Sequence, residues 1–201
     1  MGGDALEVLL ARRSIGRLTE PAPTDDELRT MLEAAAAAPD HGELRPWRFV
    51  ILRGPAKDAF GEVLADAYLA RVKAIGASPT DGQLKKERTK LERAPLVVVV
   101  CAVNQHSEEI PWIEQVLAAG AAIENLMLAA TALGYASMWR TGPAAYDHRI
   151  LHALGLDDRD AVVGFVYIGT PQEGRDLPPH EPSSLDDVVS EWQPPPRSAS
   201  Q

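Results

Sequence analysis

The stretch from Leu96 to Val103, LVVVVCAV, is a continuous run of uncharged and mostly β-branched residues. A half-buried strand alternates apolar with polar residues, whereas an unbroken apolar run is typical of a strand covered on both faces. We therefore predict a strand here, in the centre of a sheet. Cys101 is the only cysteine of the chain and lies within this run, which predicts a buried structural thiol and excludes an intramolecular disulfide.

Helices and strands are predicted on both sides of this run. Further strands are expected at 48–52, 136–140 and 162–168, and helices at 4–12, 25–38, 55–75, 83–93, 114–133 and 147–153. The helix at 25–38 begins with a capping box, in which Thr24 and Glu27 each satisfy a free backbone amide. These elements do not follow the even βα rhythm of a doubly wound sheet. The pattern favours an α+β sandwich.

Two of the predicted helices differ sharply in composition. The segment at 114–133, EQVLAAGAAIENLMLAATAL, is apolar around most of its circumference and is predicted to be buried in its own domain or against a second copy of the chain. The segment at 83–93 belongs to the charged run DGQLKKERTKLER, which is interpreted as a solvated face.

Length and charge exclude several classes of protein. The 201 residues are 45% apolar and 24% charged, which is typical of one globular domain, and the net charge of -9 argues against nucleic-acid binding. Any anion site must therefore be local. With no signal peptide and no apolar run of roughly 20 residues, we expect a cytoplasmic protein without a membrane segment.

The C-terminal segment, residues 172–201, is rich in proline and is predicted to be an extension without regular structure. Within it the island LDDVVSEW, residues 185–192, carries three apolar side chains suited to docking on a folded surface: Val188, Val189 and Trp192.

Common catalytic motifs are absent from the sequence. It contains no P-loop, no Rossmann glycine fingerprint and no GxSxG elbow, and its one cysteine lies in a strand, so covalent catalysis has no candidate. His148 and His152 are spaced like metal ligands but have no obvious third ligand, so they are interpreted as the exposed face of a short helix. No metal site is predicted.

The stretch LLARRSIGRL, residues 9–18, places Arg12, Arg13 and Ser14 at the end of the first helix. Local physics leaves two interpretations open. The cations complement the negative end of the helix dipole, or Arg12 and Ser14 converge on a phosphate with charge-assisted hydrogen bonds.

Four segments together resemble the FMN-dependent nitroreductase family. They are RRSIGR near the N-terminus, APDHGELRPWRFV at 38–50, GYASMWRTG at 134–142 and VVGFVYIGTP at 162–171. The resemblance implies a domain over residues 1–171, with an α/β/α sandwich around a mixed or antiparallel sheet. It also implies an intertwined homodimer with FMN bound between the subunits. NADH or NADPH donates the electrons in this family, and nitroaromatics, quinones or similar small molecules accept them.

The resemblance implies ten cofactor-binding residues: Arg12, Arg13, Ser14, Ala37, Pro39, His41, Arg45, Trp139, Arg140 and Thr141. Arg12 and Ser14 would hold the phosphate, Arg13 would lie near the flavin or ribityl chain, and His41 would reach the FMN of the partner subunit. Trp139, Arg140 and Thr141 would contact the cofactor through main chain and side chain. Without the resemblance, His41 is equally well interpreted as an ordinary loop histidine. Trp139 and Arg140 are then an aromatic residue at a strand end and a surface charge.

The sequence departs from the family pattern at several positions. Gly16 stands where many members have a basic residue, so the group that supports negative charge at flavin N1 and O2 is left open. Asp40, Glu43 and Arg45 replace Ser, Asn and Gln, and Arg45 is expected to tune the flavin edge, to select an anionic acceptor or to face water. Arg175 is the only candidate for the C-terminal phosphate-binding arginine.

The leading hypothesis is an NAD(P)H oxidoreductase of nitroreductase type that follows ping-pong kinetics, since donor and acceptor would share one pocket. The flavin performs the hydride chemistry, so no catalytic side chain is predicted. Two alternatives remain open. The first is a flavin-dependent dehydrogenase or dehalogenase of the same fold, and the second is a non-enzymatic protein that sequesters FMN.

Overall fold

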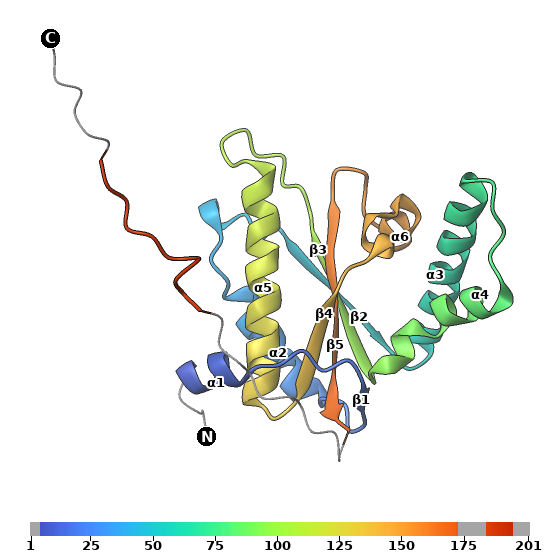
Figure 1. The fold of residues 1–201 in the computed structure, drawn as a ribbon, viewed down its shortest axis with the longest axis horizontal. Helices are drawn as coiled ribbons and strands as arrows, with labels where there is room; N and C mark the ends of the chain where they lie inside the picture. The colour runs from blue at the N-terminus through green and yellow to red at the C-terminus, as the bar shows by residue number, and fades with distance from the viewer. Residues whose placement is uncertain (1–4, 173–183, 195–201) are drawn as a thin grey trace, which may run out of the picture.

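The computed structural model describes residues 5–172 and 184–194, and its helices and strands form three layers (Figure 1). An antiparallel sheet lies in the middle, with α2 and α5 packed on one face and α3 and α6 on the other. The strands are β1 (Leu18–Thr19), β2 (Trp47–Arg53), β3 (Leu96–Ala102), β4 (Ala136–Arg140) and β5 (Ala161–Pro171). The helices are α1 (Ala5–Ala11), α2 (Asp25–Ala36), α3 (Pro55–Ala74), α4 (Asp81–Arg88), α5 (Trp112–Ala132) and α6 (His148–Ala153). The predicted α+β sandwich is confirmed.

The sheet is ordered β1-β5-β3-β2, and β4 also pairs with β5. All of these pairings are antiparallel, and an isolated parallel bridge joins Ser14 to Ser137. Every residue of β3 is buried, which confirms the predicted central strand. Its side chains alternate between the layers, because Val97 and Val99 pack with α3 and α6 while Val98 and Val100 pack with α2 and α5.

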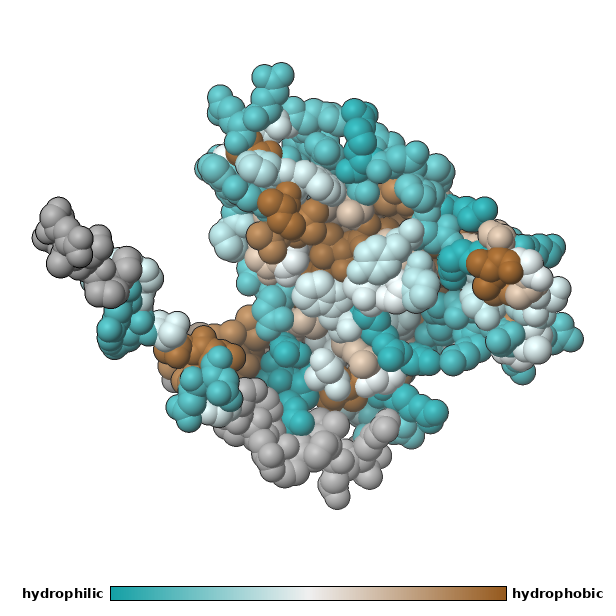
Figure 2. Space-filling model, turned by 45° about the horizontal axis from the view of Figure 1, so that its top comes forward, coloured by the Kyte–Doolittle hydropathy of each residue, from teal (hydrophilic) through white to brown (hydrophobic). Residues whose placement is uncertain are grey.

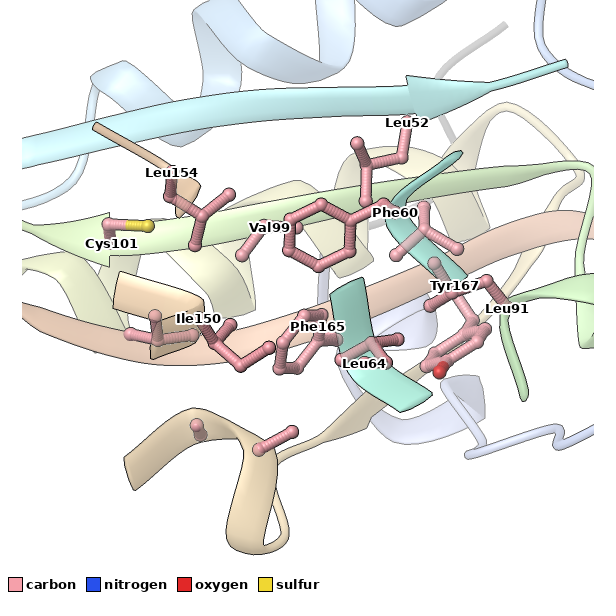
Figure 3. Packing of buried hydrophobic residues seen from close by; sticks show 14 of the residues in the cluster. Leu52, Phe60, Leu64, Leu91, Val99, Cys101, Ile150, Leu154, Phe165 and Tyr167 are labelled. Carbon is pink, nitrogen blue, oxygen red and sulfur yellow. The ribbon is translucent and has the colours of Figure 1, made fainter. Parts of the chain in front are cut away.

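One of the two apolar cores lies between the sheet and α3 (Figure 3). Val99 and Cys101 of β3 and Phe165 of β5 meet Phe60 and Leu64 of α3 there. Burial raises the pKa of the Cys101 thiol to about 12, because the thiolate would lose its hydration in this core. The prediction of a buried structural cysteine is confirmed.

The charged segment predicted as one helix at 83–93 is two elements in the structure. Thr80 and Gln83 form a capping box that starts α4 at Asp81, and a separate 3-10 turn covers Lys90–Arg93. The second part is held close to the sheet, because Leu91 is buried in the core beneath α3. The interpretation of the whole run as a solvated face is therefore wrong for its C-terminal half.

Helix α5 is the longest helix of the chain's described part, and eight of its residues are buried. By length and composition it would suffice to cross a membrane, which corrects the statement that no such run exists. In the structure it lies along the sheet as a core helix (Figure 1). The face turned away from the sheet carries exposed Ile113 and Leu117.

Other apolar side chains also lie on the surface, where Figure 2 shows them gathered in patches between hydrophilic regions. Leu6, Leu9 and Leu10 of α1 are exposed, and Asp4, the first residue of the helix predicted at 4–12, lies outside the described residues. The C-terminal island does not dock on its own domain, because its four large apolar residues are 63–82% exposed: Leu185, Val188, Val189 and Trp192.

Candidate functional site

The N-terminal basic cluster lies where α1 ends and the chain turns to run beside β4. Arg12 donates through Nε to Oε1 of Glu124 on α5, at 3.1 Å. Its Nη1 is buried and has no hydrogen-bond partner within the described part of the chain. A buried donor without an acceptor costs free energy, so this nitrogen suits a ligand that supplies an oxygen acceptor.

The next residues join this cluster to β4. Ser14 pairs with Ser137, and the amide of Ile15 donates to the carbonyl oxygen of Ser137 at 3.0 Å. The predicted RRS and WRT segments are therefore neighbours in space, since Ser137 lies two residues before Trp139. Ser14 itself is exposed, and Arg13 is half-buried.

Gly16 lies tightly against β4. A Cβ atom at this position would lie 3.2 Å from Sδ of Met138, closer than ordinary van der Waals contact. Any longer side chain at position 16 would therefore require Met138 to move.

The end of β4 is anchored by the indole of Trp139. Its Nε1 donates to the carbonyl oxygen of Val163 at 3.2 Å, and the ring lies across Gly164 of β5. A Cβ atom at Gly164 would lie 2.5 Å from Cδ1 of the indole, so only glycine leaves room for the ring in this position. This contact fixes the strand end that leads into Arg140 and Thr141, both of which are exposed.

A cavity of about 410 Å³ opens where β4 ends, between α3, α4 and the sheet. It is lined by Leu64, Lys86, Glu87, Lys90, Leu91, Arg93, Trp139, Arg140, Thr141, Gly142, Ala144, Phe165 and Tyr167. Three predicted residues thus line one cavity, Trp139, Arg140 and Thr141. Sequence reasoning missed the contribution of Lys86, Glu87, Lys90 and Arg93. One signal in the sequence could have revealed it. Leu91 is an apolar residue in the charged run, just before a buried strand, which indicates that this part of the run packs against the core.

The cavity carries an excess of positive charge in a chain whose net charge is -9. Four cationic side chains line it, and Glu87 is the only carboxylate among its lining residues. Glu87 forms an ion pair with Lys90, and the side chains of both residues are largely shielded from water, with 18% and 25% exposed. Burial raises the pKa of the Tyr167 phenol, so this wall of the cavity stays uncharged. The arrangement suits a flat, partly apolar ligand with anionic or carbonyl groups.

The predicted residues of the Pro39 loop lie elsewhere in the molecule. Ala37, Pro39, His41 and Arg45 are all exposed. Nδ1 of His41 lies 2.6 Å from Oε2 of Glu114, in the first turn of α5. Since Glu114 and Glu124 are ten residues apart on this helix, His41 and Arg12 contact it about 15 Å apart along its axis. One protomer therefore does not bring these two predicted residues together.

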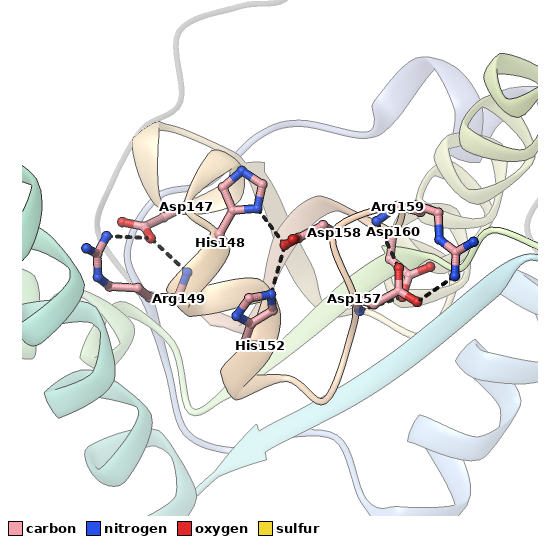
Figure 4. Close-up of polar contacts among 8 residues, drawn as sticks. All are labelled: Asp147, His148, Arg149, His152, Asp157, Asp158, Arg159 and Asp160. Atoms are coloured by element: carbon pink, nitrogen blue, oxygen red, sulfur yellow. Dashed lines mark hydrogen bonds and ion pairs between the residues drawn. The ribbon is translucent and has the colours of Figure 1, made fainter.

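The histidine pair has a common acceptor that the sequence did not reveal (Figure 4). His148 and His152 each contact Oδ1 of Asp158, both at 2.8 Å, and all three side chains are exposed. Within the described ranges, no group of three or more histidine, cysteine or acidic side chains has an arrangement that could hold a metal ion. Arg175, the C-terminal candidate for phosphate, lies outside the described residues.

Comparison with known proteins identifies the class. The model of the Nitroreductase family matches residues 9–170. The chain therefore belongs to the Nitroreductase family and is an oxidoreductase.

Particular relatives support this assignment. The chain is 38% identical over 169 residues to "Putative NAD(P)H nitroreductase YdjA" of Escherichia coli K12, with 84% of this chain and 89% of the relative covered. It is 33% identical to "Putative NAD(P)H nitroreductase" of Haemophilus influenzae, with 85% and 90% covered. The crystal structure of a nitroreductase with bound FMN from Bacteroides fragilis matches with a TM-score of 0.69 and 27% identity, over 94% of this chain and all of the other.

Proposed function

We propose that this chain is an FMN-dependent NAD(P)H oxidoreductase of nitroreductase type. The observation that carries the proposal is the buried Nη1 of Arg12, a donor without an acceptor, on a segment that runs beside β4, the strand at whose end a cationic cavity opens. The names of the relatives and the FMN bound to the Bacteroides protein support the same cofactor and donor. Bound FMN would supply the redox chemistry between NADH or NADPH and a small acceptor.

The residues of the site fit the parts of FMN. Arg12, through its unpartnered Nη1, and the exposed hydroxyl of Ser14 would hold the phosphate as hydrogen-bond donors. The cavity offers an apolar wall from Phe165 and Tyr167, and cations for the carbonyl edge of the flavin. Seven further residues are proposed to contact the cofactor: Arg13, Ala37, Pro39, His41, Arg45, Arg140 and Thr141. Trp139 contributes by holding the end of β4.

Gly16 offers no cation to support negative charge at flavin N1 and O2, and we assign this role to the Glu87–Lys90 pair. Lys90 places a cation in the cavity, where negative charge on a reduced flavin edge would develop, and Glu87 limits the net charge. None of the side chains is assigned as a general acid, because the proton taken up by the acceptor comes from solvent. Ping-pong kinetics follow from one cavity serving both the donor and a nitroaromatic or quinone acceptor.

We further propose that the protein works as an intertwined homodimer. Ile113 and Leu117 on the outer face of α5 are 60% and 64% exposed, and burying such side chains against a second copy is favourable. The exposed leucines of α1 and the C-terminal island are additional surface for the same partner. In such a dimer, His41 would contact the FMN bound by the second protomer. We assign residues 1–171 to the catalytic domain and residues 172–201 to a C-terminal extension. The proposed location of the protein is the cytoplasm.

The deciding experiment is the absorption spectrum of the purified protein, followed by anaerobic titration with NADH and with NADPH. We expect a flavin spectrum that bleaches with at least one donor and recovers with menadione or a nitroaromatic. Flavin that binds but is not bleached by either donor would favour a dehydrogenase or dehalogenase of the same fold. Flavin that is reduced but turns over no acceptor would favour FMN sequestration. Protein that takes up no FMN would refute the proposal.

The same sample tests the assembly. Light scattering during size-exclusion chromatography should give the mass of a dimer, and Leu117→Arg should shift it toward the monomer, because the charge would have to be buried in the interface. Ile75→Arg is the matched control, since Ile75 is equally large, 80% exposed and at the end of α3 on the other side of the sheet.

A further inference from the structure

The side chains of His41 and Glu114 form a close pair on the surface of the domain. Nδ1 of His41 lies 2.6 Å from Oε2 of Glu114, which is the distance of a strong hydrogen bond to a charged group. Glu114 is in the first turn of α5, where the helix dipole favours a carboxylate. The acceptor is therefore fixed on a core helix and does not depend on a loop.

The loop that carries His41 is also held in place. Gly42 has a φ of 73°, a backbone conformation that strains any residue with a side chain, and its backbone lies close to Cδ1 of Ile110. Farther along, the amide of Arg45 donates to Oδ2 of Asp40 at 2.6 Å. Despite these restraints the imidazole is exposed at 66%, and Glu114 at 41%. A locally restrained loop thus presents a histidine that its own domain does not cover.

The hydrogen bond to Glu114 determines which ring nitrogen faces outward. A carboxylate only accepts, so Nδ1 carries a proton and donates it. In the neutral ring, Nε2 then has a free lone pair and accepts a hydrogen bond from whatever lies opposite. Glu114 is three residues before exposed Leu117, so the two side chains are neighbours on the face of α5 that the proposed dimer covers.

We propose that Glu114 is a positioning residue, which holds His41 in the Nδ1–H form so that Nε2 accepts a hydrogen bond from an O–H or N–H group of the flavin nucleotide bound by the second copy. This inference rests on the proposed function. Glu114 acts through His41 and does not contact the cofactor. The contact between His41 and Glu114 lies about 15 Å along α5 from the contact between Arg12 and Glu124. In this proposal, His41 and Arg12 of one protomer therefore bind different FMN molecules of the dimer.

The test combines a spectroscopic readout with a double-mutant cycle. In ¹⁵N-labelled holoprotein at about pH 8, long-range ¹H–¹⁵N correlation identifies the protonated ring nitrogen of His41, assigned by its loss in His41→Gln. We expect Nδ1–H in the native protein and in Glu114→Gln, whose amide oxygen still accepts, and loss of this form in Glu114→Ala. FMN affinity should fall about tenfold in Glu114→Ala and in His41→Ala, with little further loss in the double variant.

Glu109→Ala is the matched control, because it removes an exposed carboxylate just before α5 and should change neither readout. An Nε2–H ring in the native protein, an unchanged FMN affinity in Glu114→Ala, or additive losses in the double variant would overturn the inference. These results are distinct from failure of the proposed function, which would appear as native protein that takes up no FMN.

Discussion

Arg12 and Glu124, 112 residues apart in sequence, are joined by a 3.1 Å bond that ties the N-terminal segment to the middle of α5. The bond uses only Nε of the guanidinium and leaves Nη1 buried without a partner in the described part of the chain. Glu124 thus orients Arg12 while a second donor stays available. This geometry favours the interpretation of RRS as an anion clamp over that of a helix end complemented by charge.

Replacing Arg12 by alanine is expected to weaken FMN binding about 10- to 150-fold, because a charge-assisted hydrogen bond contributes about 1.5–3 kcal/mol. Fluorescence titration of the apoprotein measures this affinity. The fold should be retained, because Arg12 follows a short helix with no buried residues. Arg29→Ala, which removes an exposed arginine from α2, is the control. Equal FMN affinities of Arg12→Ala and the native protein would contradict the anion clamp and favour the interpretation of Arg12 and Arg13 as charges that complement the helix dipole.

Replacing either member of the Glu87–Lys90 pair should change the redox potential of bound FMN in opposite directions. Lys90→Met leaves a shielded carboxylate beside the flavin and should lower the midpoint potential, whereas Glu87→Gln leaves the cation and should raise it. Shifts of tens of millivolts are expected, since about 30 mV corresponds to 1.4 kcal/mol in a two-electron couple. Spectroelectrochemistry measures them. Shifts of the same sign in both variants would contradict a role in charge balance.

Replacing Gly164 by alanine should destabilise the protein by about 1–3 kcal/mol, because the new methyl group overlaps the indole of Trp139 and displaces it from Val163. Gly120→Ala adds the same group at 3.9 Å from the other edge of that ring, an ordinary contact, and should not lower stability. Thermal unfolding of both variants measures the difference. Similar melting temperatures for the two would show that the indole is not confined as described.

Acid sensitivity is expected from Asp147, which is buried at the start of α6. Burial alone raises the pKa of this carboxyl, but hydrogen bonds from the Arg149 amide and the Arg71 side chain outweigh burial, so the pKa lies below the ordinary 3.8. A lowered pKa in the folded state stabilises the protein above the unfolded value, and this contribution disappears as pH falls through the folded value.

As pH is lowered below about 4, the melting temperature of the native protein should therefore fall more steeply than that of Asp147→Asn. The asparagine keeps an oxygen that can cap α6 but does not titrate. Parallel curves for the two proteins would exclude Asp147 as a source of the acid sensitivity.

The elements that were predictable from sequence share a local cause. LVVVVCAV is recognisable as a buried strand because every residue is apolar, and the capping box at Thr24 involves residues three apart. The motifs that mark the family also lie within short windows. The class of protein and most of the predicted cofactor-binding residues follow from such windows.

The cavity wall at Glu87 and Lys90 was not predictable in this way. Charged residues at helical spacing are usually solvated, and only the packing of Leu91 beneath α3 turns this part of the run toward the sheet. The glycine at position 164 is likewise explained only by an indole from a neighbouring strand.

The sequence by itself thus determined most of the elements, the family and the polar residues proposed to bind a flavin nucleotide, because these depend on near neighbours in the chain. Only the tertiary structure decided which of those residues meet. It placed RRS beside β4, joined Arg12 to Glu124, and held His41 against Glu114 some 15 Å farther along α5. The physical reason is that contacts between segments distant in sequence depend on how the helices pack across the sheet.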